Sequence, residues 1–175
     1  MKRYIVFLKQ VPQSTRVEID PVTNTLKRSS ALCQTNPDDL CALQAALNLK
    51  KETQAEVVAV SMGPGSAETV LREALQHGAD RAVLLSSPAF AGSDTWCTSK
   101  VLAAAVQKIG TFDLLFFGRM AIDGDTAQVG PEVAGQLGIP QVTQLIRIEG
   151  ITPSSIWLAK RAGNVRQQME IAFPC

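Results

Sequence analysis

The residues that decide the fold are DLLFFGRMAIDGDTAQVGPEVAGQLG, which run from Asp113 to Gly138. The apolar run 113–117 predicts a buried parallel strand, and residues 132–138 predict a helix that ends at a glycine. The small-residue turn between them lies where α/β sheets bind nucleotides, because free backbone N–H groups and a helix dipole face an anion there. Nucleotide binding is therefore the leading hypothesis. The alternative, from the pattern alone, is a connection that holds no ligand.

Unbroken apolar runs recur along the chain at 4–8, 57–60, 82–85 and 114–117. Continuous rather than alternating hydrophobicity indicates strands that are covered on both faces, as in a parallel sheet. Helical patterns over about 36–51, 66–76 and 94–109 fall between these runs. The alternation predicts a doubly wound α/β domain, a single domain over 1–175.

Two regions depart from this alternation. Residues 17–27 contain a turn-rich centre between two short extended pieces, which predicts a β-hairpin excursion before the first helix. After Pro140, the segments 142–148, 155–159 and 166–173 are expected to be strands.

Composition excludes several classes of function. The net charge is +1 and aromatic residues make up 5% of the chain, so we expect no nucleic-acid partner. The apolar run near the amino terminus is too short for a signal peptide or a membrane span, and we expect no membrane insertion. The four cysteines show no C-x-x-C pairing and only one histidine accompanies them, which argues against a metal site. Reduced thiols in the cytoplasm are the expected state.

The chain lacks the familiar catalytic motifs. It contains no G-x-x-x-x-G-K-[ST] segment and no G-x-S-x-G elbow, and a single histidine leaves little material for a catalytic triad. The glycines at 63 and 65 begin like a dinucleotide fingerprint, but Glu68 occupies the third glycine position. Binding is therefore better supported than catalysis.

Polar residues near the expected strand exits can be assigned local roles. Asn36 precedes Pro37 and is expected to cap the first helix, which makes ligand contact the less favoured reading from the residues alone. Of Asp123 and Asp125, one is expected to cap the helix that follows and the other to bond turn amides, because either carboxylate would repel a phosphate. Thr126 can add a hydroxyl contact to a ligand.

Several collinear motifs together resemble the β subunit of electron-transfer flavoproteins, the EtfB/FixA family. They are KQVP from Lys9, Asn36-Pro37, SMGP from Ser61, AL-x-x-GADRA from Ala74, FAGSDT from Phe90, and GR-x-AIDGDTAQVGP from Gly118. The resemblance covers essentially the whole chain, and the last motif is highly specific.

The resemblance implies a Rossmann-like, three-layer α/β fold with a mostly parallel sheet, of the adenine-nucleotide alpha-hydrolase-like kind. It implies an electron carrier subunit rather than a self-contained enzyme. Its cofactor would be FAD, with AMP as the alternative, and the form of the last motif favours the FAD-containing, electron-bifurcating type, with NADH as a possible electron donor. The implied partners are an electron-transfer flavoprotein α subunit and a dehydrogenase or oxidoreductase.

The resemblance implies cofactor-binding residues near the strand exits, with no metal ligand and no catalytic residue. They are Phe7, Lys9, Asn36, Pro37, Asp38, Asp39, Ser61, Met62, Gly63, Gly118, Arg119, Met120, Ala121, Ile122, Asp123, Gly124, Asp125, Thr126, Ala127, Gln128, Val129 and Gly130.

One departure from the family pattern is expected at the carboxyl terminus. Family members continue into an arm that wraps the α subunit, and this chain stops where the arm would begin, so we expect weakened assembly with an α subunit.

The competing hypothesis is a stand-alone adenine-nucleotide-binding module of the stress-protein type. Its glycine-rich motif late in the chain is not found here. A ligase or hydrolase on the same scaffold would need a Ser-Gly-Gly-type loop after the first strand, where Lys9-Gln10-Val11-Pro12 stands instead.

Overall fold

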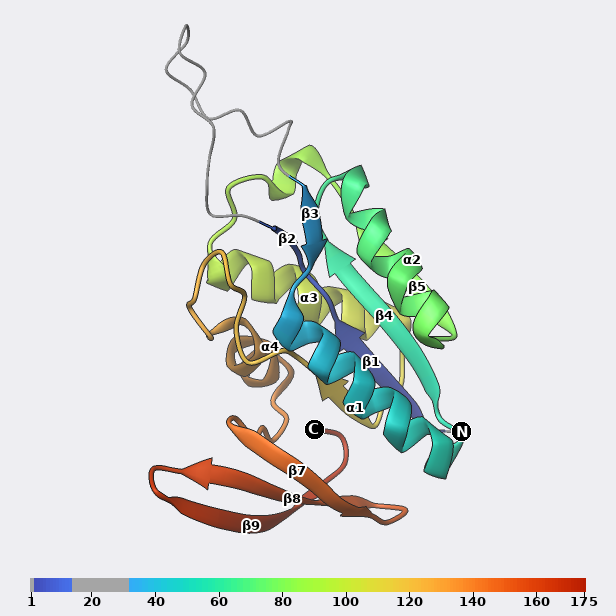
Figure 1. Ribbon diagram of the computed structural model, residues 1–175, viewed down its shortest axis with the longest axis vertical. Coiled ribbons are helices and arrows are strands. Elements are labelled where there is room, and N and C mark those ends of the chain that lie inside the picture. Colours follow the sequence, from blue (N-terminus) through green and yellow to red (C-terminus); the bar gives the residue numbers. More distant parts are fainter. Residues whose placement is uncertain (1, 14–31) are drawn as a thin grey trace, which may run out of the picture.

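The computed structural model describes residues 2–13 and 32–175. The amino-terminal half alternates strand and helix, and three long strands close the described chain (Figure 1). The elements are β1 (Arg3–Phe7), β2 (Gln10–Pro12), β3 (Cys33–Thr35), α1 (Pro37–Thr53), β4 (Glu56–Met62), η2 (Gly65–Ala67), α2 (Glu68–His77), β5 (Arg81–Leu85), η3 (Pro88–Phe90), α3 (Thr95–Ile109), β6 (Leu114–Phe116), α4 (Val129–Leu137), β7 (Leu145–Ile151), β8 (Ser155–Ala162) and β9 (Val165–Ala172).

A four-stranded parallel sheet with the order β5-β4-β1-β6 forms the centre of the molecule. Alternate residues of β1 belong to different cores: Tyr4 and Val6 pack with α1 and α2, whereas Ile5 and Phe7 pack with α3 and α4. In Figure 1, α1 and α2 accordingly lie in front of this sheet and α3 behind it. Burial on both faces explains the unbroken apolar runs, and the predicted α/β class is confirmed.

The expected elements of this half are found within one to three residues of their predicted bounds. Two shifts have clear local causes. Asp94 stands outside α3 as its N-cap, because its carboxylate accepts a hydrogen bond of 2.7 Å from the Cys97 N–H. Gly78 ends α2 in the left-handed conformation with φ of 115°.

The expected hairpin at 17–27 lies outside the described residues. The segments around it are described: β2 pairs with β3 in an antiparallel ribbon, between β1 and α1.

The three strands expected after Pro140 are present, with the first shifted to β7 at Leu145–Ile151. They form an antiparallel sheet of their own, in the order β7-β8-β9, at the bottom of Figure 1. Its inner face packs Ile156 and Leu158 against the core that α1 shares with β1. This sheet is separate from the parallel sheet and from the β2–β3 ribbon, so the described residues form three sheets.

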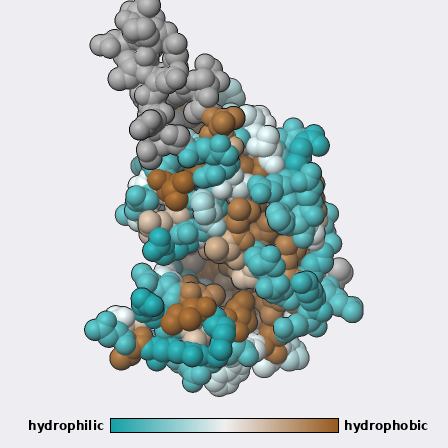
Figure 2. Space-filling model, in the orientation of Figure 1, coloured by the Kyte–Doolittle hydropathy of each residue, from teal (hydrophilic) through white to brown (hydrophobic). Residues whose placement is uncertain are grey.

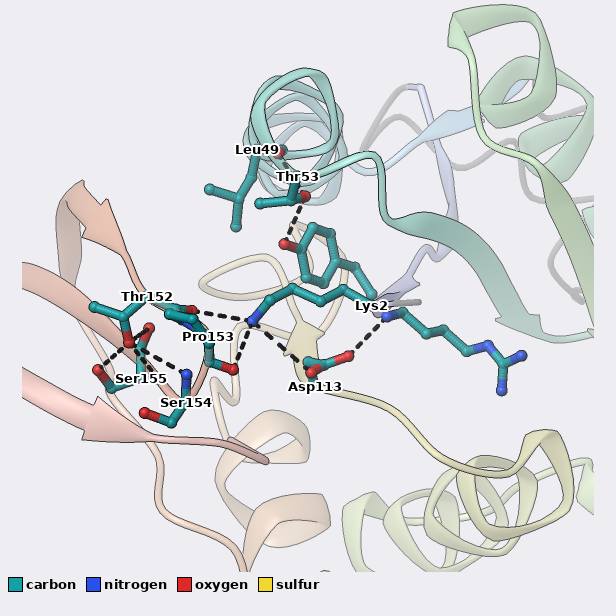
Figure 3. A network of polar contacts seen from close by, with 10 residues as sticks. Lys2, Leu49, Thr53, Asp113, Thr152, Pro153, Ser154 and Ser155 are labelled. Atoms are coloured by element: carbon teal, nitrogen blue, oxygen red, sulfur yellow. Dashed lines mark hydrogen bonds and ion pairs between the residues drawn. The ribbon is translucent and has the colours of Figure 1, made fainter.

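Lys2 fastens the antiparallel sheet to the parallel one (Figure 3). Its ammonium donates to the carbonyl oxygens of Thr152 and Pro153, at 3.1 and 3.2 Å, and lies 4.0 Å from a carboxylate oxygen of Asp113. The same ammonium stands 3.9 Å from the centre of the Phe173 ring. One cation therefore contacts the β7–β8 turn, the start of β6 and the end of β9.

We predict that Lys2→Met lowers the free energy of unfolding by about 1–2 kcal/mol, because hydrogen bonds to a charged donor and a cation–π contact are lost. Urea denaturation followed by circular dichroism measures this change. Lys51→Met, at an exposed lysine of α1, is the control and should change the value by less than about 0.5 kcal/mol. Equal effects of the two substitutions would show that Lys2 does not fasten the sheets.

Candidate functional site

The connections of the parallel sheet create a crevice between β1 and β6. The chain leaves β1 towards α1 on one face of the sheet and leaves β6 towards α4 on the other face. Such a switch point, at the carboxyl ends of the strands, is where open α/β sheets bind ligands. The same edge receives the exits of β4 and β5.

A cavity of about 1720 Å³ opens at this edge. One part lies among the strand exits and the loop 118–130, and an apolar part continues between α1 and the strands β7 and β8. Figure 2 shows the hollow between the main body and the lower sheet, with apolar residues around it.

Most of the expected site residues line this cavity. They are Phe7, Lys9, Asp38, Asp39, Met62, Gly63, Gly118, Arg119, Met120, Ala121, Gly124, Asp125, Thr126, Ala127, Gln128, Val129 and Gly130. The structure thus brings together residues from the exits of β1, β4 and β6 and from the starts of α1 and α4.

Five expected residues do not line it. Pro37 is exposed at the start of α1, and Ile122 is 42% exposed on the loop. Ser61 is buried in β4, and its hydroxyl has no hydrogen-bond partner among the described residues. Asp123 pairs with Lys9, with 2.7 Å between carboxylate and ammonium, and Asn36 is fully buried beneath the loop.

Asn36 occupies the N-cap position of α1 as expected, but the expected capping bond from its side chain is absent. Its side chain makes no capping bond to α1 and instead reaches the loop, where its amide nitrogen donates to the Met120 carbonyl at 2.9 Å. Its amide oxygen accepts from the Ile122 N–H at 3.2 Å. The loop offers a carbonyl and an N–H two residues apart, and a planar amide matches both.

The expected aspartate cap of α4 is also wrong. Gln128 occupies the N-cap position without a side-chain bond, so neither Asp123 nor Asp125 caps the helix. Asp123 forms an ion pair with Lys9, and Asp125 lies in the left-handed region with φ of 51°. The first turn of α4 is therefore not capped by a loop carboxylate, and its first two residues, Val129 and Gly130, line the cavity. The N–H groups of a helix start have no partner within the helix.

Asp39 joins the exits of β1 and β6. One carboxylate oxygen accepts from the Lys9 N–H at 2.8 Å, and the other accepts from the Gly118 N–H at 3.2 Å. Burial raises the pKa of the Asp39 carboxyl to about 6, against the opposite effect of the hydrogen bonds from Lys9, Asn36 and Gly118.

Most of the negative charge around the cavity is compensated. Asp38 accepts from the Arg119 guanidinium at 3.2 Å, Asp123 pairs with Lys9, and Asp39 is bonded by backbone N–H groups. Asp125 is exposed on the loop and makes no ion pair among the described residues. The site therefore offers backbone N–H groups and a helix start to an anion with little opposing charge.

Sequence reasoning missed two groups of cavity residues. Phe117 stacks on Phe7 with ring centroids 4.2 Å apart and an interplanar angle of 7°, and both line the cavity. Residues 86–88 and 90–95 line it as well. Their signal was available, since they follow β5 at the same edge of the sheet.

The sequence matches the family model described as electron transfer flavoprotein domain over residues 23–173. The chain belongs to the electron transfer flavoprotein family. It is 51% identical to the electron transfer flavoprotein subunit beta of Thermoanaerobacterium thermosaccharolyticum, over 83% of this chain and 55% of that protein. It is 47% identical to Protein FixA of Azorhizobium caulinodans, over 98% of this chain and 63% of that protein.

A third relative is subunit CarD of the caffeyl-CoA reductase-Etf complex of Acetobacterium woodii. It is 44% identical, over 99% of this chain and 66% of that protein. The chain thus spans about three fifths of the length of the curated relatives that it matches. The family model covers β3 to β9, and therefore the starts of α1 and α4 and the loop between β6 and α4.

Within residues 2–13 and 32–175, no helix has the length and apolar character needed to cross a membrane. Across the same part of the chain, no cluster of three or more histidine, cysteine, aspartate or glutamate side chains could hold a metal ion.

The unusual ionisation of Asp39 predicts a pH effect on stability. Its pKa in the folded state, about 6, lies above the ordinary value of 3.8 for an aspartate, so the folded state binds this proton more tightly. The contribution of Asp39 to stability is therefore greatest below pH 4 and falls as the pH rises to 6, by on the order of 3 kcal/mol.

Asp39→Asn cannot ionise and lacks this contribution. The free energy of unfolding of the wild type minus that of Asp39→Asn should shrink between pH 4 and pH 6 and then stay constant. Urea titrations of both proteins at half-unit pH steps measure the difference. A constant difference, or one that grows with pH, would contradict a buried carboxyl with a raised pKa.

Proposed function

We propose that this protein is a β subunit of an electron-transfer flavoprotein that binds an adenine nucleotide in the cleft at the β1–β6 switch point. The nucleotide is FAD, with AMP as the alternative. With an α subunit, the protein passes electrons from a dehydrogenase or from NADH to an acceptor in the cytoplasm. The observation that carries the proposal is the loop 118–130, which a family match covers and which lines a cavity at the strand exits.

The donor chemistry of the cleft fits a phosphate-bearing ligand. The start of α4 lines the cavity and makes no side-chain cap bond, and the carboxylates of Asp123, Asp38 and Asp39 are bonded to Lys9, to Arg119 and to backbone amides. The loop approaches the start of α1 closely because residue 118 is a glycine: a Cβ there would lie 2.2 Å from an Asp39 oxygen. These residues favour an anion beside the loop.

In this proposal the residues of the chain bind and orient rather than react. Loop amides and the start of α4 hold the phosphates, and Thr126 and Gln128 are placed at the cavity wall to add polar contacts. The stacked pair Phe7 and Phe117 gives the floor of the cleft an apolar surface that excludes water. When FAD is bound, its flavin supplies the electron-transfer chemistry.

Two findings favour FAD over AMP. The loop has the form DGDTAQVG, which resembles the electron-bifurcating type. One relative is described as a subunit of a caffeyl-CoA reductase-Etf complex and another as an acryloyl-CoA reductase electron transfer subunit. Their descriptions place those two proteins in electron-transfer assemblies, and we extend this role to the present chain.

The nucleotide that copurifies with the protein tests this proposal. After purification without added cofactor, heat-released material is separated by HPLC and an absorption spectrum is recorded. We expect FAD near one equivalent and a flavin absorption band. If AMP is released and no flavin is found, the nucleotide of the cleft is AMP rather than FAD. A protein that contains neither, and that binds neither in calorimetric titrations, would contradict nucleotide binding.

A pair of glycine variants serves as the control. Gly118→Ala should abolish binding, because its Cβ would meet Asp39 and the backbone of Asp38 at under 3.0 Å. Gly135→Ala lies in α4 with nothing within 4 Å of the added Cβ, and it should bind like the wild type.

A further inference from the structure

Asn36 and Asp39 stand at the start of α1 with polar side chains that are almost completely buried, with exposed fractions of 0% and 7%. Buried polar groups are costly unless they are hydrogen-bonded, so their partners show what they do. Neither side chain bonds to its own helix in the way of a cap. Both bond to the backbone of other segments.

The hydrogen-bonding atoms of both side chains are already used within the protein. The Asn36 amide bonds Met120 and Ile122, and the Asp39 carboxylate bonds Lys9 and Gly118. The backbone of Asn36 adds a bond of 2.9 Å from its N–H to the Lys9 carbonyl. The start of α1 therefore holds the exit of β1 and the first residues of the loop in one fixed arrangement.

The loop is divided by these contacts. Residues 118–122 are bonded at Gly118, Met120 and Ile122 by the two buried side chains. Residues 124–128 are exposed and line the cavity, and two of them, Asp125 and Ala127, adopt positive φ angles of 51° and 54°. Non-glycine residues rarely adopt this conformation, which persists where neighbouring structure enforces it.

We propose that Asn36 and Asp39 are positioning residues, which hold the first half of the loop in its ligand-binding shape through bonds to its backbone. This inference rests on the proposed function. It changes the expected role of the fully buried Asn36 from ligand contact to preorganisation, and it adds preorganisation to the role of Asp39, which lines the cavity. Holding the loop in advance strengthens binding because less ordering is needed when the ligand arrives.

The experiment compares Asn36→Ala with the wild type in the absence and presence of nucleotide. Amide hydrogen exchange of Gly118 and Ile122 is followed by NMR without ligand, and the dissociation constants of AMP and FAD are measured by calorimetry. We expect the Ile122 amide to exchange at least roughly tenfold faster, and both nucleotides to bind roughly tenfold more weakly, because the hydrogen bonds of the Asn36 side chain to Met120 and Ile122 are lost.

Asp80→Asn is the matched control. Like Asp39, Asp80 is a carboxylate that accepts from a backbone N–H, that of Val57 at 2.8 Å, but it lies at the other end of the sheet. We expect this variant to be less stable and to keep the loop exchange and the nucleotide affinities of the wild type. Equal loop exchange in Asp80→Asn and Asn36→Ala would mean that both act through global stability, which would overturn the proposal.

Two further outcomes decide between the hypotheses. Weaker nucleotide binding in Asn36→Ala with unchanged exchange would identify Asn36 as a direct contact and overturn positioning. If the wild type binds neither nucleotide, the proposed function fails, and the exchange data alone decide whether Asn36 orders the loop. Should Asn36→Ala not fold, Asn36→Ser keeps a small polar side chain that is too short to bond Met120 and Ile122 together, so faster exchange of the Ile122 amide is expected there too.

Discussion

The structure depends on the close approach of the β6 exit to the start of α1. A Cβ at Gly118 would lie 2.2 Å from an Asp39 oxygen and 2.7 Å from the backbone of Asp38 and Asp39, so only glycine fits. This approach lets a single carboxylate bond Lys9 and Gly118 at once. The exits of the neighbouring strands β1 and β6 are thereby fixed relative to each other, and the cleft between them has a defined width.

This arrangement places the Asp39 carboxyl where water solvates it poorly, and this burial raises its pKa. The arrangement persists because Asp39 ties three segments together. The remaining charges at the cleft are paired at its rim, Lys9 with Asp123 and Arg119 with Asp38. What faces the cavity is then largely backbone amide, helix start and apolar wall, a combination suited to the phosphates and rings of a nucleotide.

Sequence reasoning could find the parallel sheet because its strands are buried on both faces, which leaves continuous apolar runs such as 4–8. It could identify the loop 118–130 as a candidate ligand site because small residues between a buried strand and a helix are typical of nucleotide-binding turns. It could not assign Asn36, because an asparagine before a proline is an equally good cap, and only the fold brings Met120 and Ile122 to its side chain. Nor could alternating segments after Pro140 show that they pair with one another rather than with β6.

The central claim is that an adenine nucleotide occupies the cleft at the switch point between β1 and β6. Its most direct test is an NMR titration of isotopically labelled protein with AMP and with FAD, followed by mapping of the shifted amides. The account predicts shifts at residues 124–130 and at Gly63, with little change in β7 to β9. Shifts confined to the antiparallel sheet, or none at saturating nucleotide, would contradict it.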